Sequence, residues 1–216
     1  MLNIKVFVFN GLSENTFVLY NAKGQCVIVD AGNSNKTEDE MIFKFIDDNH
    51  LTPLMLLSTH LHIDHVLGNY SLNKRYGISL AAYPVDKEYI MGVWRYAGVF
   101  GIDVDENNYI FPEIELSENE VIKVGEDYIK VLYTPGHALG HVCFYDEADG
   151  FILTGDTLFY RSVGRYDFPG GSYVELENSV RNCLYKLPDN TVCYPGHGRS
   201  TTIGDEKVYN HVIPLR

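Results

Sequence analysis

The residues with the clearest chemical potential form one short histidine-rich run. The segment HLHIDH, residues 60–65, places three histidines and an aspartate close together. Neutral imidazole and carboxylate groups are common ligands of Zn²⁺ and of non-haem iron. His60 and His62, two apart, can point to one side of an extended loop, and the next pair, Asp64 and His65, then points elsewhere. The spacing therefore favours two neighbouring metal positions over one.

Three further ligand-type residues each follow a glycine at the predicted end of a strand. His137 and His197 follow Pro-Gly pairs, and Asp156 follows Gly155. Glycine lets the backbone approach a site closely, and a carboxylate can bridge two cations. Each residue could instead be an ordinary core or turn residue. The repeated context leads us to expect all three at the same site.

Four other residues have two interpretations each. Asp30 ends a predicted strand and is expected to orient a ligand histidine, or else to be a plain turn residue. His141 is expected to form hydrogen bonds near the site, with direct ligation as the alternative. Arg161 and Arg165 could bind a substrate carboxylate or form ion pairs within their own loop.

The candidate residues need strands and helices that bring them together. Apolar runs bounded by turn residues predict strands over residues 4–9, 16–20, 26–29, 54–57, 121–124, 128–133, 142–145, 151–153 and 191–194. The first three are expected to be antiparallel. Capping-box patterns at 37–40 and 172–175 predict two helix starts, and apolar spacing predicts a third helix over 64–76. The histidine segment therefore lies where a strand leads into a helix, a place where the backbone turns sharply.

Composition limits the class of protein. The 216 residues carry 17 Lys and Arg against 29 Asp and Glu, a net charge of −12, and 45% are hydrophobic. We therefore expect a single folded domain over residues 1–216. An acidic surface repels the phosphates of nucleic acids and anionic membranes. This favours a small-molecule substrate, with no nucleic-acid or membrane partner, and leaves the oligomeric state open.

The cysteines and the apolar runs indicate the compartment. The chain has four cysteines, Cys26, Cys143, Cys183 and Cys193, with no CxxC pair. They are expected to be small core residues in a reducing environment. No apolar run has the length of a membrane span. We therefore expect a cytoplasmic protein.

The segment over residues 84–112 is rich in aromatic side chains. They are Tyr89, Trp94, Tyr96, Phe100, Tyr109 and Phe111. Ordinary packing is one interpretation. The other is an aromatic wall beside the site, the kind of surface that binds an acyl group.

The motifs and their order resemble those of the metallo-β-lactamase superfamily. HLHIDH, PGH, GDTLF and PGH follow one another, and GRYDFPGG at 164–171 is similar to hydroxyacylglutathione hydrolase, also called glyoxalase II, and its short relatives. The resemblance implies an α+β fold, a four-layer αββα sandwich. It also implies one metal ion on His60, His62 and His137, a second on Asp64, His65 and His197, and Asp156 between them.

What the resemblance implies for function is a metal-dependent hydrolase that cleaves a small-molecule thioester. The expected cofactor is a pair of divalent metal ions, zinc first, with iron or manganese as alternatives because His/Asp sites accept all three. A metal-bridging hydroxide would attack the carbonyl, oriented by Asp64. Asp156 stands where some zinc β-lactamases place a cysteine, which favours thioesters over antibiotics.

Other functions remain open at this stage. A lactonase or another ester hydrolase would use the same ligands, and a persulfide dioxygenase would use a single iron. A structural metal protein or a binding module would perform no catalysis, but structural zinc sites commonly use thiolates. None of the cysteines lies in a motif, so the ligand set favours an enzyme. The acyl group and the thiol carrier stay open.

Overall fold

The computed structural model describes residues 1–216 except 86, 96, 103, 106, 107 and 216. Tyr96 and the side chain of Phe100, named above, therefore lie outside the described part. The chain divides into two compact units, Leu2–Leu116 and Ser117–Arg216 with Met1. The single domain over residues 1–216 therefore stays a prediction.

The unit Leu2–Leu116 is built on a six-stranded sheet in the order β1-β2-β3-β4-β5-β6. Its strands are β1 Leu2–Phe9, β2 Glu14–Asn21, β3 Gln25–Val29, β4 Thr52–Leu57, β5 Leu80–Ala82 and β6 Ile114–Glu115. The first three are antiparallel, as predicted, and β3 to β6 run parallel. Parallel strands end at one edge, so Asp30 after β3 and His60 after β4 leave the sheet at the same edge.

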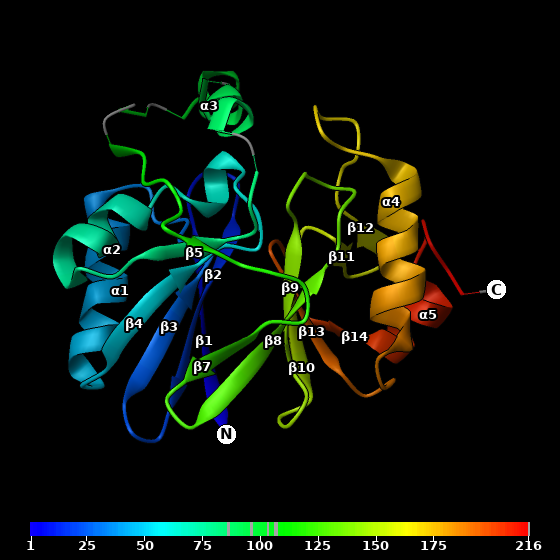
Figure 1. Ribbon diagram of the computed structural model, residues 1–216, viewed down its shortest axis with the longest axis horizontal. Coiled ribbons are helices and arrows are strands. Elements are labelled where there is room, and N and C mark those ends of the chain that lie inside the picture. Colours follow the sequence, from blue (N-terminus) through cyan, green and yellow to red (C-terminus); the bar gives the residue numbers. More distant parts are fainter. Residues whose placement is uncertain (86, 96, 103, 106–107, 216) are drawn as a thin grey trace. The chain divides into compact units, whose positions relative to one another are not determined.

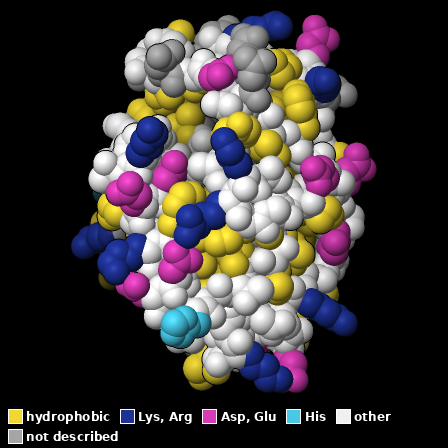
Figure 2. Space-filling model, turned by 90° about the vertical axis from the view of Figure 1, so that its left-hand side faces the viewer, with side chains coloured by type: hydrophobic (Ala, Val, Ile, Leu, Met, Phe, Trp, Pro, Cys, Tyr) yellow, Lys and Arg dark blue, Asp and Glu magenta, His cyan; other side chains and the backbone are white. Residues whose placement is uncertain are grey.

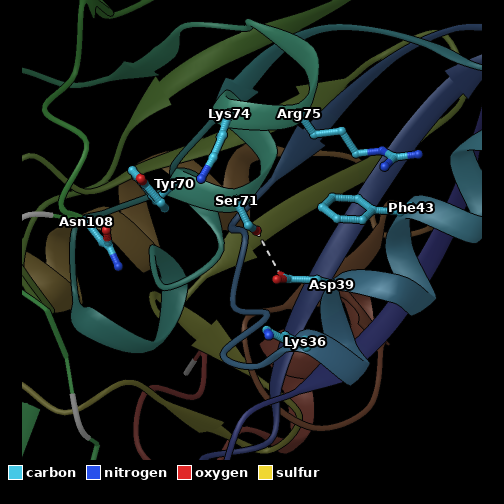
Figure 3. A pocket seen from close by; sticks show the side chains of 8 residues that line it. All are labelled: Lys36, Asp39, Phe43, Tyr70, Ser71, Lys74, Arg75 and Asn108. Atoms are coloured by element: carbon cyan, nitrogen blue, oxygen red, sulfur yellow. Dashed lines mark hydrogen bonds between the residues drawn. The ribbon is translucent and has the colours of Figure 1, made fainter.

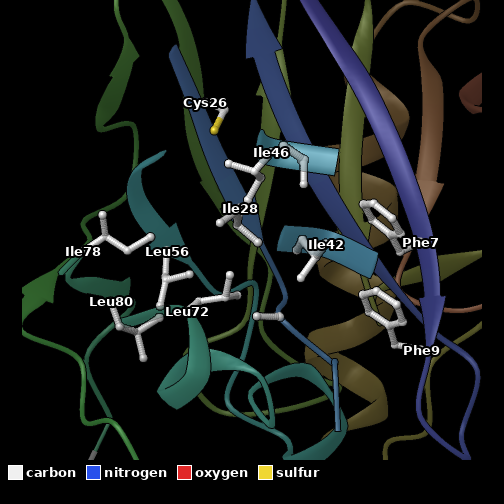
Figure 4. Packing of buried hydrophobic residues seen from close by; sticks show 12 residues of the cluster. Phe7, Phe9, Cys26, Ile28, Ile42, Ile46, Leu56, Leu72, Ile78 and Leu80 are labelled. Carbon is white, nitrogen blue, oxygen red and sulfur yellow. The ribbon is translucent and has the colours of Figure 1, made fainter. Parts of the chain in front are cut away.

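Two helices cover one face of this sheet (Figure 1). The helices of the unit are α1 Lys36–Asp48, α2 Asn69–Tyr76 and α3 Lys87–Arg95, with 3₁₀ turns at Ile63–His65 and Ala97–Phe100. Ile42 and Ile46 of α1 and Leu72 of α2 are buried among strand residues such as Ile28 and Leu56 (Figure 4). Each such side chain stabilises the fold by about 1.5–3 kcal/mol, which holds β3 and β4 in place.

The start of α1 differs from the sequence prediction. The N-cap is Asn35, whose side-chain oxygen accepts hydrogen bonds from the N–H groups of Thr37 (3.0 Å) and Glu38 (3.1 Å). The capping box at 37–40 was therefore wrong. The physical reason is that asparagine caps at least as well as threonine and stands earlier in the chain.

The helix predicted over 64–76 is interrupted. Residues 63–65 form the 3₁₀ turn, and α2 begins only at Asn69. The N–H of Gly68 donates to the carbonyl of Ala31 (2.7 Å) instead of to a helical partner, which prevents a continuous helix. Gly77 closes α2 as expected, with a left-handed φ of 66° that suits glycine.

The unit Ser117–Arg216 contains a second six-stranded sheet in the order β14-β13-β10-β9-β8-β7. Its strands are β7 Val121–Val124, β8 Asp127–Tyr133, β9 Val142–Asp146, β10 Phe151–Gly155, β13 Val192–Pro195 and β14 Thr201–Thr202. A separate pair joins β11 Leu158–Phe159 to β12 Ser162–Val163. Because β8 and β10 are both antiparallel to β9, and β13 is parallel to β10, three strands end at one edge.

Helices also cover one face of this second sheet. They are α4 Tyr173–Asn178, continued by a π turn Ser179–Cys183 and a 3₁₀ turn Leu184–Lys186, and α5 Ile203–Tyr209. Leu176, Val180 and Ile203 pack with Cys143 and Ile152. Ser172 caps α4 by accepting from the N–H of Glu175 (3.3 Å), as the sequence predicts.

The cysteines behave as core residues. All four are free thiols, and Cys26, Cys143 and Cys193 are buried. Burial raises the pKa of Cys26 to about 12 and, with a smaller effect from Glu118, that of Cys183 to about 11. In the described part of the chain, no helix is both long enough and apolar enough to cross a lipid bilayer.

Candidate metal centre

The histidine segment lies between β4 and α2, and its side chains gather in one place. The ring centroids of His60 and His62 lie 4.6 Å apart, and those of His60 and His65 lie 4.2 Å apart. His65 Nε2 is 3.6 Å from Asp64 Oδ2. His60, Asp64 and His65 are buried, and His62 is half-buried. The first unit therefore brings its four predicted ligands together.

Asp30 supports this segment from the end of β3. Its Oδ1 accepts from the Thr59 N–H (2.7 Å) and its Oδ2 from the Thr59 hydroxyl (2.7 Å), while Oδ2 also lies 3.2 Å from His65 Nδ1. An ionised carboxylate only accepts hydrogen bonds, so the proton of a neutral His65 belongs on Nδ1. The lone pair of Nε2 then faces Asp64. This geometry fits the orienting role predicted for Asp30.

The edge of the second sheet collects the remaining predicted ligands. Asp156 Oδ2 lies 3.5 Å from His137 Nε2 and 3.7 Å from His197 Nε2. His137 Nδ1 is 2.6 Å from the carbonyl oxygen of Arg165, which can only accept. The proton is therefore on Nδ1, and the Nε2 lone pair faces the carboxylate. The Nε2 lone pair of His137 and the Asp156 carboxylate oxygen are both acceptors, so they repel each other unless a proton or a cation lies between them.

Each unit thus shows the same arrangement, which fits a divalent cation. His65 Nε2 faces Asp64 Oδ2, and His137 Nε2 faces Asp156 Oδ2. Each imidazole has a hydrogen-bond acceptor on its far nitrogen, as metal-ligating histidines commonly do. The donor set is imidazole nitrogen and carboxylate oxygen, which zinc, iron and manganese all accept.

His141 lies behind Asp156 and is fully buried. The backbone N–H of Asp156 donates to His141 Nε2 (3.0 Å), and His141 Nδ1 lies 3.0 Å from the Thr134 hydroxyl and 3.1 Å from that of Thr157. Because an N–H only donates, His141 is neutral with its proton on Nδ1. Its Nε2 is already used, which favours the predicted hydrogen-bonding role over direct ligation.

Two glycines let the backbone close around this second cluster. A Cβ on Gly164 would lie 1.9 Å from the Asp156 carbonyl oxygen and 2.9 Å from His137 Nδ1. A Cβ on Gly136, whose φ is 129°, would lie 2.1 Å from the backbone nitrogen of Leu176. A larger residue at either position must displace the chain that carries the ligands.

The two arginines predicted near the substrate form contacts within the protein. Arg161 Nη1 donates to the Asp205 carbonyl (2.8 Å) and lies 3.6 Å from Glu206 Oε1. Arg165 makes paired hydrogen bonds to Asp167, at 2.9 and 2.8 Å. The Arg165–Asp167 pair is the ion pair within its own loop that was given above as the alternative, whereas Arg161 pairs outside its loop, with Glu206 of α5. The substrate role of Arg161 and Arg165 stays a prediction.

Sequence reasoning missed Glu14, which starts β2 and is fully buried. Its Oε2 accepts from the Thr16 hydroxyl (2.8 Å), and its Oε1 lies 3.8 Å from His65 Nδ1. Burial raises the pKa of this carboxyl well above its usual range, opposed by His65 and reinforced by Asp30. The only signal in the sequence is an acidic residue at the head of an apolar strand.

The family model of the metallo-β-lactamase superfamily matches residues 10–197, a span that contains every predicted ligand. The chain belongs to this superfamily. The resemblance of the motifs is thereby confirmed, together with the predicted metallo-β-lactamase fold, a mixed α+β fold with two sheets and several helices.

Three similar members of the superfamily bear on function. Hydroxyacylglutathione hydrolase GloC of Haemophilus influenzae is 31% identical over 212 residues, which cover 97% of each protein. The crystal structure of BLEG-1 B3 metallo-β-lactamase has a TM-score of 0.87 at 27% identity, covering 98% of this chain and 99% of that one. TTHA1623 in a di-iron-bound form has a TM-score of 0.84 at 32% identity, covering 96% and 98%. The fold is shared, but the activities named for the first two proteins differ.

In this superfamily member the aromatic segment packs into a small core of the first unit. The Trp94 and Tyr109 rings meet edge to face at 4.8 Å, and Tyr109 meets Phe111 at 4.7 Å. Trp94 and Tyr109 are buried in one cluster with Leu61 and Ile63 of the histidine segment. For the described residues, this favours packing over an open wall.

A surface groove of about 560 Å³ in the first unit contains none of the predicted site residues (Figure 3). It is lined by Lys36, Asp39, Phe43, Tyr70, Ser71, Lys74, Arg75 and Asn108. The Ser71 hydroxyl donates to Asp39 (2.8 Å) across the two helices. Figure 2 shows Lys and Arg side chains beside exposed hydrophobic ones on this side of the molecule. The groove is therefore separate from the ligand set.

Proposed function

We propose that this protein is a dinuclear-metal hydrolase that cleaves a small-molecule thioester, similar to hydroxyacylglutathione hydrolase. The observation that carries the proposal is that, in each unit, the Nε2 lone pair of a histidine faces a carboxylate oxygen. His65 faces Asp64 in one unit, and His137 faces Asp156 in the other. Superfamily membership and the similarity to the Haemophilus influenzae protein support it. The net charge of −12 supports a cytoplasmic role on small molecules, without nucleic-acid or membrane partners.

The proposed metal centre uses the ligand set implied by the superfamily. In the proposal, His60, His62 and His137 would hold one ion, Asp64, His65 and His197 would hold the other, and Asp156 would serve both. Zinc is the first candidate. The di-iron-bound form of TTHA1623 supports a centre with two ions and supports iron as the alternative metal. Bound divalent ions supply a nucleophile at neutral pH by lowering the pKa of water from about 15.7 to about 7, and they polarise a carbonyl.

The chain's own groups orient the ligands and fix their protons. Asp30 and the Arg165 carbonyl keep protons on Nδ1 of His65 and His137, so that each Nε2 faces inward. His141 holds the Asp156 backbone through its N–H. In the proposal Asp64 accepts a hydrogen bond from the attacking water and aims it at the substrate carbonyl.

The type of bond that is cleaved follows from whether the motif residues can donate a proton to the leaving group. Each histidine and aspartate of the four motifs is proposed as a ligand, and His141 Nε2 is occupied by the Asp156 N–H. An amine leaving group needs a proton from a positioned acid. A thiolate does not, because its conjugate thiol has a pKa of about 8.5. The proposal is therefore a thioesterase rather than an amidase.

A substrate panel with metal analysis on the same samples tests this proposal. Protein reconstituted with zinc, iron or manganese is assayed on acyl thioesters of two thiol carriers, on lactones and on a persulfide. We expect thioester hydrolysis to be fastest in protein with two ions per chain. Faster lactone hydrolysis supports the ester-hydrolase alternative, and oxygen consumption with a persulfide on one iron supports a dioxygenase.

A further inference from the structure

Glu14 is a buried carboxyl that the proposed reaction does not use. Its side chain is fully buried, and Oε2 accepts from the Thr16 hydroxyl (2.8 Å). Oε1 makes no hydrogen bond with any described residue. Leaving a buried acceptor unsatisfied destabilises the folded state. A purely structural role for Glu14 does not explain why the fold keeps Oε1 buried without a hydrogen bond from the described part of the chain.

Two carboxyls face the same nitrogen of His65. Asp30 Oδ2 lies 3.2 Å and Glu14 Oε1 lies 3.8 Å from His65 Nδ1. Asp30 shares its oxygens with Thr59, which occupies both of them. The three ligand-type groups lie within 4.8 Å of one another. The donors from Thr59 mark this as a hydrogen-bonding cluster rather than a further metal site.

The backbone fixes Glu14 in this position. The N–H of Gly32 donates to the Thr16 hydroxyl oxygen (2.9 Å), which in turn donates to Glu14. A Cβ on Gly32 would lie 1.9 Å from Glu14 Oε2 and 2.6 Å from the Asp64 carbonyl oxygen. Glu14 is therefore packed against the loop after β3, and that loop is packed against the histidine segment.

We infer that Glu14 is a positioning residue for His65, holding the Nδ1 edge of the ring together with Asp30 so that Nε2 is presented beside Asp64. The inference rests on the proposed function, because it concerns the ion that His65 is proposed to hold. A second carboxyl oxygen 3.8 Å behind a ligand imidazole acts on the ring electrostatically. It restricts ring rotation and makes Nε2 a stronger electron-pair donor to a metal ion. Glu14 acts through His65 and touches neither substrate nor metal.

The test compares Glu14→Met and Glu14→Gln with the wild type. Met keeps the size and removes both acceptor oxygens, whereas Gln retains one. We expect Glu14→Met to weaken binding of one of two ions by about 10- to 100-fold and to leave the other unchanged. Glu14→Gln should rescue part of that loss. The measurements are chelator-competition titrations and unfolding temperatures, with and without metal.

The unfolding temperatures separate positioning from a structural role. Glu14→Met removes the unsatisfied Oε1, which favours the folded state, but it also leaves the buried Thr16 hydroxyl without its acceptor, which disfavours it. Because these two effects oppose each other, metal-free Glu14→Met should unfold near the wild-type temperature, while the rise caused by metal shrinks. A fall in the metal-free temperature with an unchanged metal-induced rise would overturn the inference.

Glu206→Met is the matched control, because Glu206 is equally buried but accepts from Arg161, Thr201 and Asn210. It should lower stability and leave both metal affinities unchanged. Wild-type protein that binds fewer than two ions contradicts the proposed function and the inference together. Wild type with two ions, beside Glu14→Met with two unchanged affinities, overturns the inference alone.

Discussion

At the scale of single residues, the candidate chemistry depends on which nitrogen of each imidazole faces the carboxylates. His65 and His137 have acceptors next to Nδ1, from the Asp30 carboxylate and the Arg165 backbone carbonyl. These partners settle the position of the proton, and with it the donor that remains. Motif spacing identifies such histidines, but it does not reveal a backbone carbonyl as the partner.

Asp156→Ala removes the one ligand proposed to serve both ions. We expect metal content to fall at both positions and kcat/KM to drop by more than about 100-fold, beyond the loss usual for a residue that only supports a ligand. His211→Ala is the control, because His211 is exposed and belongs to no motif. Elemental analysis and steady-state kinetics check both variants. Equal effects from the two substitutions would mean that the site is misplaced.

The sequence identified the candidate ligands because their types recur in short motifs, but it missed Glu14. A lone glutamate before Asn15 belongs to no motif, and its place beside His65 is a tertiary contact between the start of β2 and the 3₁₀ turn Ile63–His65. The partners of Arg161 could not be predicted from sequence patterns either, since Asp205 and Glu206 lie far along the chain. Contacts of this kind need the tertiary structure.

At the scale of elements, strand direction brings the candidate residues together. The nine predicted strands all occur, with ends within two residues of those observed. The sequence did not predict β11, β12 and β14. Each has only two residues, which is too short to show an alternation of apolar and polar side chains. The start of α1 was misplaced because both Asn35 and Thr37 are good capping residues and only the backbone decides between them.

Asn35→Ala and Thr37→Ala test which residue caps α1. Asn35 satisfies two N–H groups of the first turn. Its replacement should lower the free energy of unfolding by about 1 kcal/mol. Thr37→Ala should change that free energy by less than about 0.5 kcal/mol. Urea unfolding measures both, and a larger loss from Thr37→Ala would restore the predicted capping box.

Gly164→Ala tests whether the loop after β12 presses on the candidate ligands. The added Cβ must displace the Asp156 backbone or the His137 ring, so we expect less bound metal and lower activity. Gly92→Ala lies in α3 with open space around it and should stabilise the fold by roughly 0.5–1 kcal/mol. Normal metal content in Gly164→Ala would contradict the observed packing.

At the scale of the whole molecule, an acidic chain presents five histidines as proposed ligands. Imidazole binds metal only when neutral, so protons compete with metal as the pH falls. Bound metal and activity should therefore be lost together below about pH 6. Metal content and rate after equilibration across a pH series check this. Protein that keeps both at about pH 5 would contradict ligation by histidine.

The most direct measurement of the central claim is kcat/KM for an acyl thioester and for its matched amide, on one metal-loaded preparation. The proposed centre supplies a nucleophile but no acid for a leaving amine. We therefore expect the thioester to be cleaved far faster than the amide or a β-lactam. Cleavage of the amide as fast as the thioester would contradict the proposed function.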